Sequence, residues 1–353
     1  MNITYLFGAG ASAYAIPTIE NIPEHLEEFY LYLDNIEDSP PGPNVSPQHY
    51  EYRPEKPSSQ LKKDIKWLID NLKYATSIDT LAKRLFIKNS KDYFKIKALM
   101  IIFFVFEHFR NLGDKDNDPT LKYKPQNTAI RKIDPRYDNF FAFLIQKEID
   151  DLPNIKILSW NYDMQFEMAF DEYSGLGNFI KNQIYLQIFP SHEVRGFDKS
   201  HFGIVKLNGS LQIQRKDDNI LPLLYLDKSL QMYSLVRNLI NDYVSLIERD
   251  RPNPYLFFSW ENKDINIQTK KIAYEIASET DVLIVIGYSF PYFNRAWDRE
   301  IFGGMRQLQK VYFQAPSNDL DNYFSRFKAI NSLIPYHEDI SDLGQFFIPP
   351  ELG

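Results

Sequence analysis

Five short apolar runs along the chain have the length and bounds of buried β-strands. They are residues 4–7, 155–160, 204–207, 282–286 and 310–313. Small or polar residues follow four of these runs at once, as expected where a strand ends in a turn. Continuous apolar runs, without alternation of polar residues, are typical of parallel strands covered on both faces. The run 282–286, VLIVI, is the strongest strand signal.

Apolar residues at helical spacing separate these runs. The helical segments are residues 20–35, 61–112, 137–149, 227–249 and 272–279. Ser77 is placed to cap a helix that begins near Asp79, and residues 96–109 are apolar enough for a mostly buried helix. Strands that alternate with helices predict an α/β fold with a mostly parallel sheet and helices on both faces.

The domain organisation follows from where this alternation is interrupted. We expect a single domain over 1–353, with a core of residues 1–37 and 150–353 and a helical insert subdomain at about 60–149. Residues 38–59 contain six prolines and are predicted to be a loop. Whether that loop gates a pocket stays open.

Composition and charge narrow the function classes. With 27 Phe and 23 Tyr among 353 residues, the chain can bury a large core. A formal net charge of −7 provides no global basic field for nonspecific nucleic-acid binding. The absence of cysteine removes disulfides, cysteine-liganded zinc, iron–sulfur clusters and thiol nucleophiles, and the six histidines show no HExxH spacing. We expect no metal.

Membrane and secretion signals are not found. The longest apolar run, residues 98–106, has nine residues, well short of the roughly 20 that a membrane-spanning helix requires. The first residues, MNITYLFGAGAS, contain no basic segment before an apolar stretch. We therefore expect a cytoplasmic protein.

The first motif is the small-residue segment GAGASA at 8–13, directly after the first strand. It satisfies GxGxx(G/A), in which small residues let the backbone and a helix N-terminus approach a pyrophosphate. A tight turn from strand to helix is the alternative. In dinucleotide-binding proteins an acidic residue about 20 positions after this motif, at the end of a second strand, usually binds the ribose. No convincing candidate is found here, because Glu27, Glu28 and Asp34 lie in a helical segment. An ordinary nicotinamide dehydrogenase is thus disfavoured.

Polar residues also follow three later strands. Asn161 and Asp163 can hold sugar hydroxyls, orient a water and support a developing positive charge, or they can cap a helix that begins near Met164. Asn208-Gly209-Ser210 and Gly287-Tyr288-Ser289 are either turns or ligand contacts. Because ligands bind outside the carboxyl ends of strands in open α/β sheets, this convergence predicts a site there.

In this order, these segments resemble the sirtuin-like family, specifically its bacterial NAD-degrading branch found in anti-phage defence systems. The matching segments are FGAGAS at 7–12 with Ile16-Pro17-Thr18 behind it, SIDTLAKRL at 77–85, ILSWNYD at 157–163, VKLNGS at 205–210 and VLIVIGYSFP at 282–291. The resemblance spans almost the whole chain. It implies a Rossmann-like sheet with a smaller helical module.

The resemblance also implies a set of site residues. NAD+, as the substrate, would contact Gly8, Ala9, Gly10, Ala11, Ser12, Pro17, Thr18, Tyr162, Gly287, Tyr288, Ser289 and Gln314. Asn161, Asp163 and Asn208 would be the catalytic residues. The implied reaction cleaves the nicotinamide–ribose bond and releases nicotinamide and ADP-ribose.

One departure from the family pattern limits the chemistry. The family commonly has a histidine where this chain has Asn208, and asparagine is not a general base near neutral pH. Histidine-dependent deacetylation is therefore disfavoured, whereas NAD+ hydrolysis needs no strong base for the departure of nicotinamide. His192 and His201 are the nearest histidines in the sequence that could replace the missing family histidine in space. A lone loop histidine, however, is more often exposed to solvent.

Two other functions stay open beside an NAD+ hydrolase. The chain could bind NAD+ or ADP-ribose as a non-catalytic regulatory subunit, or it could be an ADP-ribosyltransferase. The resemblance further implies a homo-oligomer or a separate activating protein, such as a ring-forming ATPase. We expect no direct nucleic-acid or membrane partner.

Overall fold

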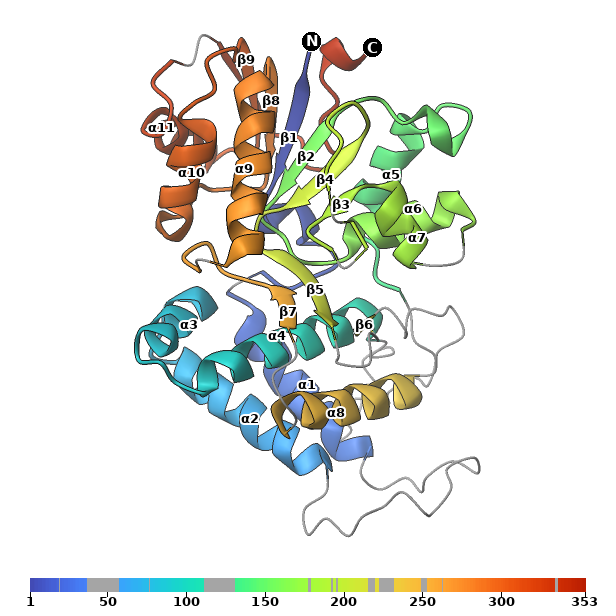
Figure 1. Ribbon diagram of the computed structural model, residues 1–353, viewed down its shortest axis with the longest axis vertical. Coiled ribbons are helices and arrows are strands. Elements are labelled where there is room, and N and C mark those ends of the chain that lie inside the picture. Colours follow the sequence, from blue (N-terminus) through green and yellow to red (C-terminus); the bar gives the residue numbers. More distant parts are fainter. Residues whose placement is uncertain are drawn as a thin grey trace. The chain divides into compact units, whose positions relative to one another are not determined.

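The computed structural model describes residues 1–18, 20–36, 57–75, 77–110, 131–176, 179–191, 193–194, 196–214, 220–221, 232–248, 253–261, 263–333 and 336–353. These residues form two compact units (Figure 1). The first contains Met1–Thr18, Ile133–Gln212 and Tyr255–Gly353, and the second contains Ile19–Lys132 and Ile213–Pro254.

A seven-stranded sheet forms the centre of the first unit, with the order β10-β9-β8-β1-β2-β4-β3. Its strands are β1 (Ile3–Phe7), β2 (Lys156–Ser159), β3 (Ile188–Phe189), β4 (Gly203–Lys206), β8 (Val282–Ile286), β9 (Lys310–Gln314) and β10 (His337–Ile340). All neighbouring strands pair in parallel, which confirms the predicted α/β fold with a mostly parallel sheet.

The strand order reverses beside β1. From β1 the chain adds β2, β3 and β4 on one side, and it later adds β8, β9 and β10 on the other. β1 and β8 are therefore neighbours although they are far apart in the sequence, with Phe7 opposite Ile286. A crevice for ligands forms at such a reversal, outside the carboxyl ends of the strands.

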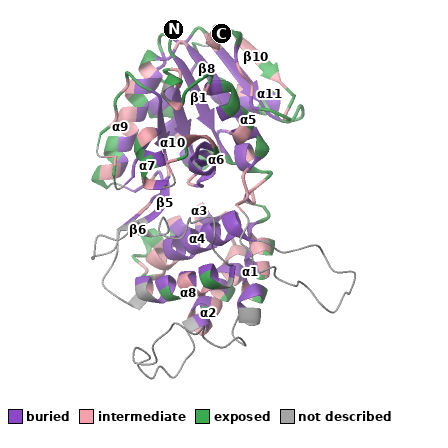
Figure 2. Ribbon diagram, turned by 90° about the vertical axis from the view of Figure 1, so that its right-hand side faces the viewer, coloured by how far each residue is buried: buried purple, intermediate pink, exposed green. Residues whose placement is uncertain are grey.

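Side chains alternate between the two faces of the sheet and bury a core on each. Tyr5 and Phe7 pack with α5 and α6, whereas Leu6 packs with α9, α10 and α11 (Figures 1 and 2). The helices of this unit are α5 (Pro135–Leu144), α6 (Gln165–Ser174), α7 (Phe179–Tyr185), α9 (Asp264–Glu279), α10 (Arg295–Phe302) and α11 (Leu320–Lys328). The continuous apolar runs in the sequence thus reflect burial on both sides.

Short elements complete the described chain. A three-stranded sheet has the order β6-β5-β7, formed by Ile220–Leu221, Gly209–Gln214 and Asn253–Leu256. The 3₁₀ helices are η1 (Ala9–Ser12), η3 (Ile149–Asp151), η5 (Tyr292–Asn294) and η6 (Pro350–Leu352).

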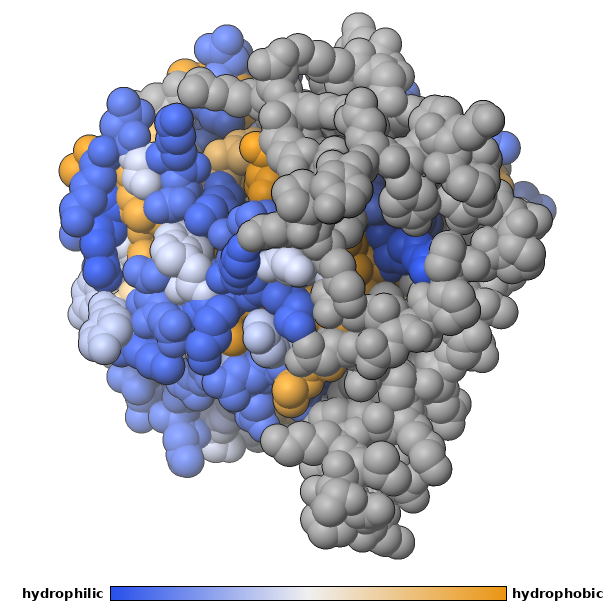
Figure 3. All heavy atoms as spheres, turned by 90° about the horizontal axis from the view of Figure 1, so that it is seen from below, coloured by the Kyte–Doolittle hydropathy of each residue, from blue (hydrophilic) through white to orange (hydrophobic). Residues whose placement is uncertain are grey.

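The second unit is built from helices. They are α1 (Ile22–Ile36), α2 (Pro57–Leu72), α3 (Ile78–Ile87), α4 (Asp92–Phe109) and α8 (Met232–Glu248). The predicted cap of α3 is confirmed, because the Ser77 hydroxyl accepts a hydrogen bond of 3.2 Å from the Thr80 amide. Every residue from Ile96 to Phe109 is buried, as predicted for that segment (Figure 2). Figure 3 shows that hydrophilic side chains predominate among the described residues on the face that it draws.

Some predicted bounds differ from the structure. The helix predicted over 137–149 is α5, which begins at Pro135 behind the Asp134 cap and ends at Leu144. Proline is favoured in the first turn because it lacks an N–H that would stay unpaired there. Residues 38–56 of the predicted loop lie outside the described residues, and Pro57 begins α2.

The predicted division into one domain with an insert at about 60–149 stays a prediction. The compact units place α1 and Ile213–Pro254 with the second unit and α5 with the first. Within the described ranges, no helix combines the length and the apolar character needed to cross a membrane.

A pair of glycine substitutions tests how tightly the loops after β1 and β8 pack. Gly175 and Gly287 have φ of +60° and +61°, but a Cβ at Gly175 meets nothing within 4 Å, whereas a Cβ at Gly287 lies 2.5 Å from the Ala11 nitrogen. Gly175→Ala should lower the free energy of unfolding by about 1–2 kcal/mol, because alanine is disfavoured in the left-handed conformation. Gly287→Ala should lower the free energy of unfolding by a further ~1–3 kcal/mol through overpacking. Urea denaturation measures both, and equal losses would contradict the close packing.

Candidate functional site

The loops after β1 and β8 pack backbone to backbone at the carboxyl edge of the sheet. The Gly8 amide donates to the Ile286 carbonyl at 3.0 Å, and the Gly10 amide donates to the Gly287 carbonyl at 3.1 Å. A Cβ at Gly8 would lie 2.6 Å from the Gly287 oxygen. The glycines of both motifs are therefore required by this packing, whatever the loop binds.

The β1 loop continues as η1, a 3₁₀ helix of four residues. The amides of Gly8, Gly10 and Ala11 already donate to protein carbonyls, so they are not available to a phosphate. Ala9 is the exposed residue of η1. Pro17 and Thr18 follow η1 and are half-buried.

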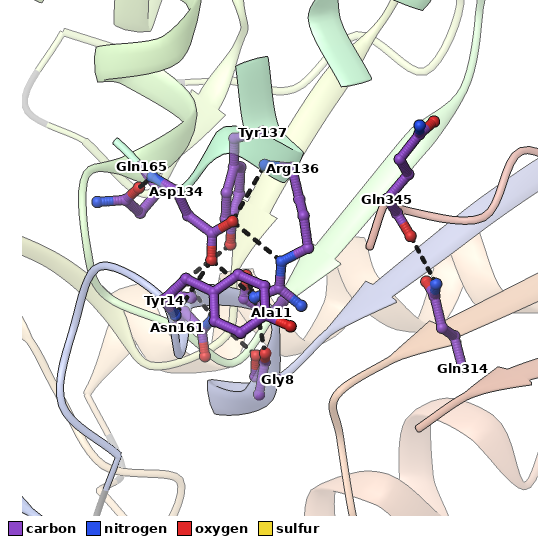
Figure 4. A network of polar contacts seen from close by, with 12 residues as sticks. Gly8, Ala11, Tyr14, Asp134, Arg136, Tyr137, Asn161, Gln165, Gln314 and Gln345 are labelled. Atoms are coloured by element: carbon purple, nitrogen blue, oxygen red, sulfur yellow. Dashed lines mark hydrogen bonds and ion pairs between the residues drawn. The ribbon is translucent and has the colours of Figure 1, made fainter. Parts of the chain in front are cut away.

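Asn161 joins the end of β2 to this loop (Figure 4). Its buried amide donates to the Gly8 carbonyl at 2.8 Å and to the Ser12 hydroxyl at 3.2 Å. The Ser12 hydroxyl also hydrogen-bonds the hydroxyl of Tyr137, which is fully buried, at 2.8 Å. Residues from three separate segments are thus held together around one serine.

Asp163 lies buried beside the same group. One of its carboxylate oxygens accepts the backbone amide of Gln165, the first residue of α6, at 3.1 Å, which supports its interpretation as a residue of the helix start, although the N-cap residue itself is Met164. Burial raises the pKa of this carboxyl above its ordinary value, although the Lys206 ammonium and a hydrogen bond from Ser12 lower it in part. A carboxyl placed here is a candidate to support positive charge when it is ionised.

Lys206 connects Asp163 to a buried ion pair. Its ammonium donates to the Asp163 carbonyl at 2.6 Å and to the Glu167 carboxylate at 2.7 Å. The side chains of Lys206 and Glu167 are both 0% exposed. A buried pair of this kind is costly to break by removing one partner, because the other charge is then left uncompensated.

The beginning of α5 contributes residues that the sequence did not single out. Asp134 caps the helix and receives the Arg136 guanidinium through two hydrogen bonds, from Nε at 2.9 Å and from Nη2 at 2.6 Å. The Arg136 guanidinium also donates to the carbonyls of Gly10 at 3.2 Å and Ala11 at 3.0 Å. The sequence Asp-Pro-Arg-Tyr signals a helix start, but nothing local indicates its contact with the β1 loop.

Asn208 is held at the end of β4. Its side-chain amide donates to the Trp160 carbonyl at 3.0 Å, and its own carbonyl accepts the Phe257 amide at 3.0 Å. Gly209 follows at φ +75°, where a Cβ would lie 1.7 Å from the Tyr255 carbonyl oxygen. The turn interpretation of this segment is therefore supported, and Asn208 is joined to Trp160, the residue between β2 and Asn161.

Tyr288 and Ser289, which follow β8, are held by contacts within the protein. The buried Tyr288 hydroxyl donates to both Asp298 oxygens at 2.9 and 3.0 Å, and its ring stacks on Trp160. The Ser289 carbonyl accepts a guanidinium hydrogen bond from Arg326 at 2.8 Å. Burial raises the pKa of Tyr288 well above its ordinary value.

The side-chain amide of Gln314 forms hydrogen bonds within the protein. It donates to the carbonyls of Gln345 at 2.7 Å (Figure 4) and Asp342 at 2.5 Å, and its oxygen accepts the Phe347 amide at 3.0 Å. Contacts of Gln314, Tyr288 and Ser289 with NAD+ stay predictions, as does the contact of the half-buried Tyr162.

Neither His201 nor His192 is shown to lie at Asn208. His201 precedes β4 and its side chain is 73% exposed, paired with Asp198 at 3.0 Å. Asn208 follows the opposite end of the same strand, so His201 does not take the place of a base there. His192 lies outside the described residues. Across the described part of the chain, no group of three or more His, Asp or Glu is arranged to hold a metal ion.

The fold and site together define a parallel α/β protein with a polar loop cluster at the reversal point of its sheet. No protein-family model matches the chain, and a search of curated proteins also finds no match. Similar solved structures include Sir2Tm bound to a propionylated peptide, with a TM-score of 0.39 and 11% identity over 97% of this chain and 88% of that one.

A second similar structure is Sir2 in complex with the inhibitor EX-527, 2′-O-acetyl-ADP-ribose and a deacetylated p53 peptide. Its TM-score is 0.37 and its identity 12%, over 97% of this chain and 89% of that one. A third, from a study of sirtuin substrate affinity, has a TM-score of 0.38 and 13% identity over 97% and 88% of the two chains. At these values the likeness does not establish a family or an activity for this chain.

The raised pKa of Asp163 predicts how the stability of the protein changes with pH. The folded state holds the Asp163 proton more tightly than the unfolded state, whose ordinary pKa is 3.8. This contribution to stability is present below that value and is lost as the pH rises through the folded pKa. The stability of the wild type relative to Asp163→Asn should therefore fall as the pH rises across this window. Urea denaturation at a series of pH values measures it, and a difference that grows with pH would show a lowered pKa instead.

Proposed function

We propose that this protein binds NAD+ at the carboxyl edge of the sheet and hydrolyses its nicotinamide–ribose bond, releasing nicotinamide and ADP-ribose. The observation that carries the proposal is the Asn161 amide bonded to Gly8 and Ser12. It joins two motifs of the sequence resemblance, more than a hundred residues apart, at the reversal point of the sheet, where α/β proteins bind nucleotides.

The chemistry of this reaction suits the groups that the site contains. Departure of nicotinamide leaves positive charge on the ribose, and a buried carboxylate at Asp163 would stabilise it. The neighbouring Lys206 is paired with Glu167, so its ammonium compensates the Asp163 charge only in part when that carboxyl is ionised. Asn161 would position the ribose and the attacking water, since its amide is fixed from the protein side.

Asn208 fits a positioning role in this reaction. Its amide is bonded to the Trp160 carbonyl, one residue before Asn161 in the chain. An asparagine supplies no general base, so water attack would depend on the charge of the ribose intermediate. Histidine-dependent deacetylation is not part of the proposal.

A second candidate function is binding of NAD+ or ADP-ribose without cleavage, in a regulatory subunit. The replacement of the family histidine by Asn208 favours it, as do the three loop amides that are already used within the protein. An ADP-ribosyltransferase is a third outcome, which would leave ADP-ribose on a macromolecule. The biological role that we propose is depletion of NAD+ in phage defence. Activation would come from self-assembly or from a partner such as a ring-forming ATPase.

Asn161→Ala should lose at least ~100-fold in NAD+ turnover, because it removes the group that positions the ribose and links the two loops. The assay incubates purified protein with NAD+ and quantifies nicotinamide and free ADP-ribose by chromatography. His201→Ala is the matched control: His201 is exposed and precedes β4, so this variant should keep wild-type turnover.

The products separate the candidate functions. Equal amounts of nicotinamide and free ADP-ribose, lost only in Asn161→Ala, support hydrolysis. Release of nicotinamide without free ADP-ribose, with the ADP-ribose found attached to protein, supports transfer. Tight binding of NAD+ without any product supports the regulatory subunit, provided that no product forms when the proteins encoded by neighbouring genes are added. Unchanged turnover in a folded Asn161→Ala variant contradicts the site.

A further inference from the structure

We propose that Arg136 is a positioning residue, which holds the 8–12 loop in the form that receives the diphosphate of the substrate. This inference rests on the proposed function for the identity of the ligand. The role of Arg136 in ordering the loop does not depend on the proposed function. Arg136 lies on α5, in none of the segments of the sequence resemblance.

The contacts of Arg136 are directed at the loop backbone. One guanidinium nitrogen, Nη2, donates to the carbonyls of Gly10 at 3.2 Å and Ala11 at 3.0 Å, in the middle of η1. A peptide group is planar and trans, so its carbonyl and its N–H point in opposite directions. Fixing the Ala11 carbonyl therefore fixes the direction of the Ser12 N–H, which points away from Arg136.

The guanidinium itself is immobilised on several sides. Asp134 binds it through both carboxylate oxygens, at 2.9 and 2.6 Å, and both residues are at least 95% buried. The Tyr14 ring lies 4.1 Å from the guanidinium carbon and the Phe346 ring 5.2 Å from it. Nε donates to Asp134, and the two hydrogens of Nη2 are shared among Asp134, Gly10 and Ala11. The planar guanidinium makes these bonds while it lies over the two rings, which a lysine ammonium does not.

The charge of Arg136 is compensated, so its effect on a ligand would be geometric. Asp134 carries the opposite charge within the same pair. A purely electrostatic role toward a diphosphate would be weakened by this neighbour. The hydrogen bonds to the loop carbonyls stay, and charged donors make the stronger ones.

The same group reaches the proposed catalytic carboxylate. The Asp134 backbone amide donates to the side-chain oxygen of Gln165 at 2.7 Å (Figure 4). The backbone amide of Gln165 in turn donates to the Asp163 carboxylate at 3.1 Å. Arg136 therefore lies in a chain of contacts that runs from the β1 loop through Asp134 and Gln165 to Asp163. A change at Arg136 should loosen the loop and the Asp163 carboxyl together.

The test compares Arg136→Met and Arg136→Lys with Thr280→Val. Thr280 is also buried, and its hydroxyl bonds Thr4 at 2.7 Å and the Ile276 carbonyl at 2.8 Å, just before β8 at the opposite edge of the sheet. Thr280→Val should thus lower stability without touching the loop. Hydrogen–deuterium exchange of the segment 8–16 is measured without ligand, and the dissociation constant of ADP-ribose is measured by calorimetry.

In Arg136→Met, the protected amides of Ala11, Ala15 and Ile16 should exchange at least ~10-fold faster, and ADP-ribose should bind ~10–100-fold more weakly. Arg136→Lys should retain most of both defects, and Thr280→Val should show neither. Wild-type exchange in Arg136→Met, or an equal increase in Thr280→Val, would overturn the role of Arg136. If the wild type binds neither ADP-ribose nor NAD+, the proposed function fails, while the exchange comparison still decides whether Arg136 orders the loop.

Discussion

The hydrogen bonds from the Asn161 amide to Gly8 and Ser12 are the contacts on which the candidate site depends. They tie the end of β2 to the loop after β1, and close glycine packing ties that loop to the one after β8. Since β1 lies between β2 and β8, these contacts join the ends of three adjacent strands. The geometry of the site is thus assembled by the protein itself, before any ligand is considered.

Much of the central sheet could be predicted from the sequence because its strands are buried on both faces. Continuous apolar runs identified β1, β2, β4, β8 and β9. β3 was missed because two residues are too short to form a pattern, and β10 because its sequence, HEDI, is mostly polar. The bounds of α5 were wrong at both ends because the pattern of apolar residues outweighed the Asp-Pro signal of its first turn.

The candidate site could be predicted only in part, for a physical reason. Strand ends in a parallel sheet share one edge, so polar residues after β1, β2, β4 and β8 were expected to meet there, and Asn161 indeed bonds the β1 loop. The contact of Arg136 with Gly10 joins residues 126 positions apart and leaves no local signal. Likewise, the sequence does not reveal that the Tyr288 hydroxyl and the Gln314 amide are bound within the protein.

The central claim is that the three joined loops form a nucleotide site, and a crystal structure of the protein with ADP-ribose tests it most directly. We expect the diphosphate against the exposed Ala9 and the ribose that carried nicotinamide beside Asn161 and Asp163. Arg136 should keep its contacts with Gly10 and Ala11 in that complex. ADP-ribose bound elsewhere, with the 8–12 loop unaltered and empty, would contradict the account.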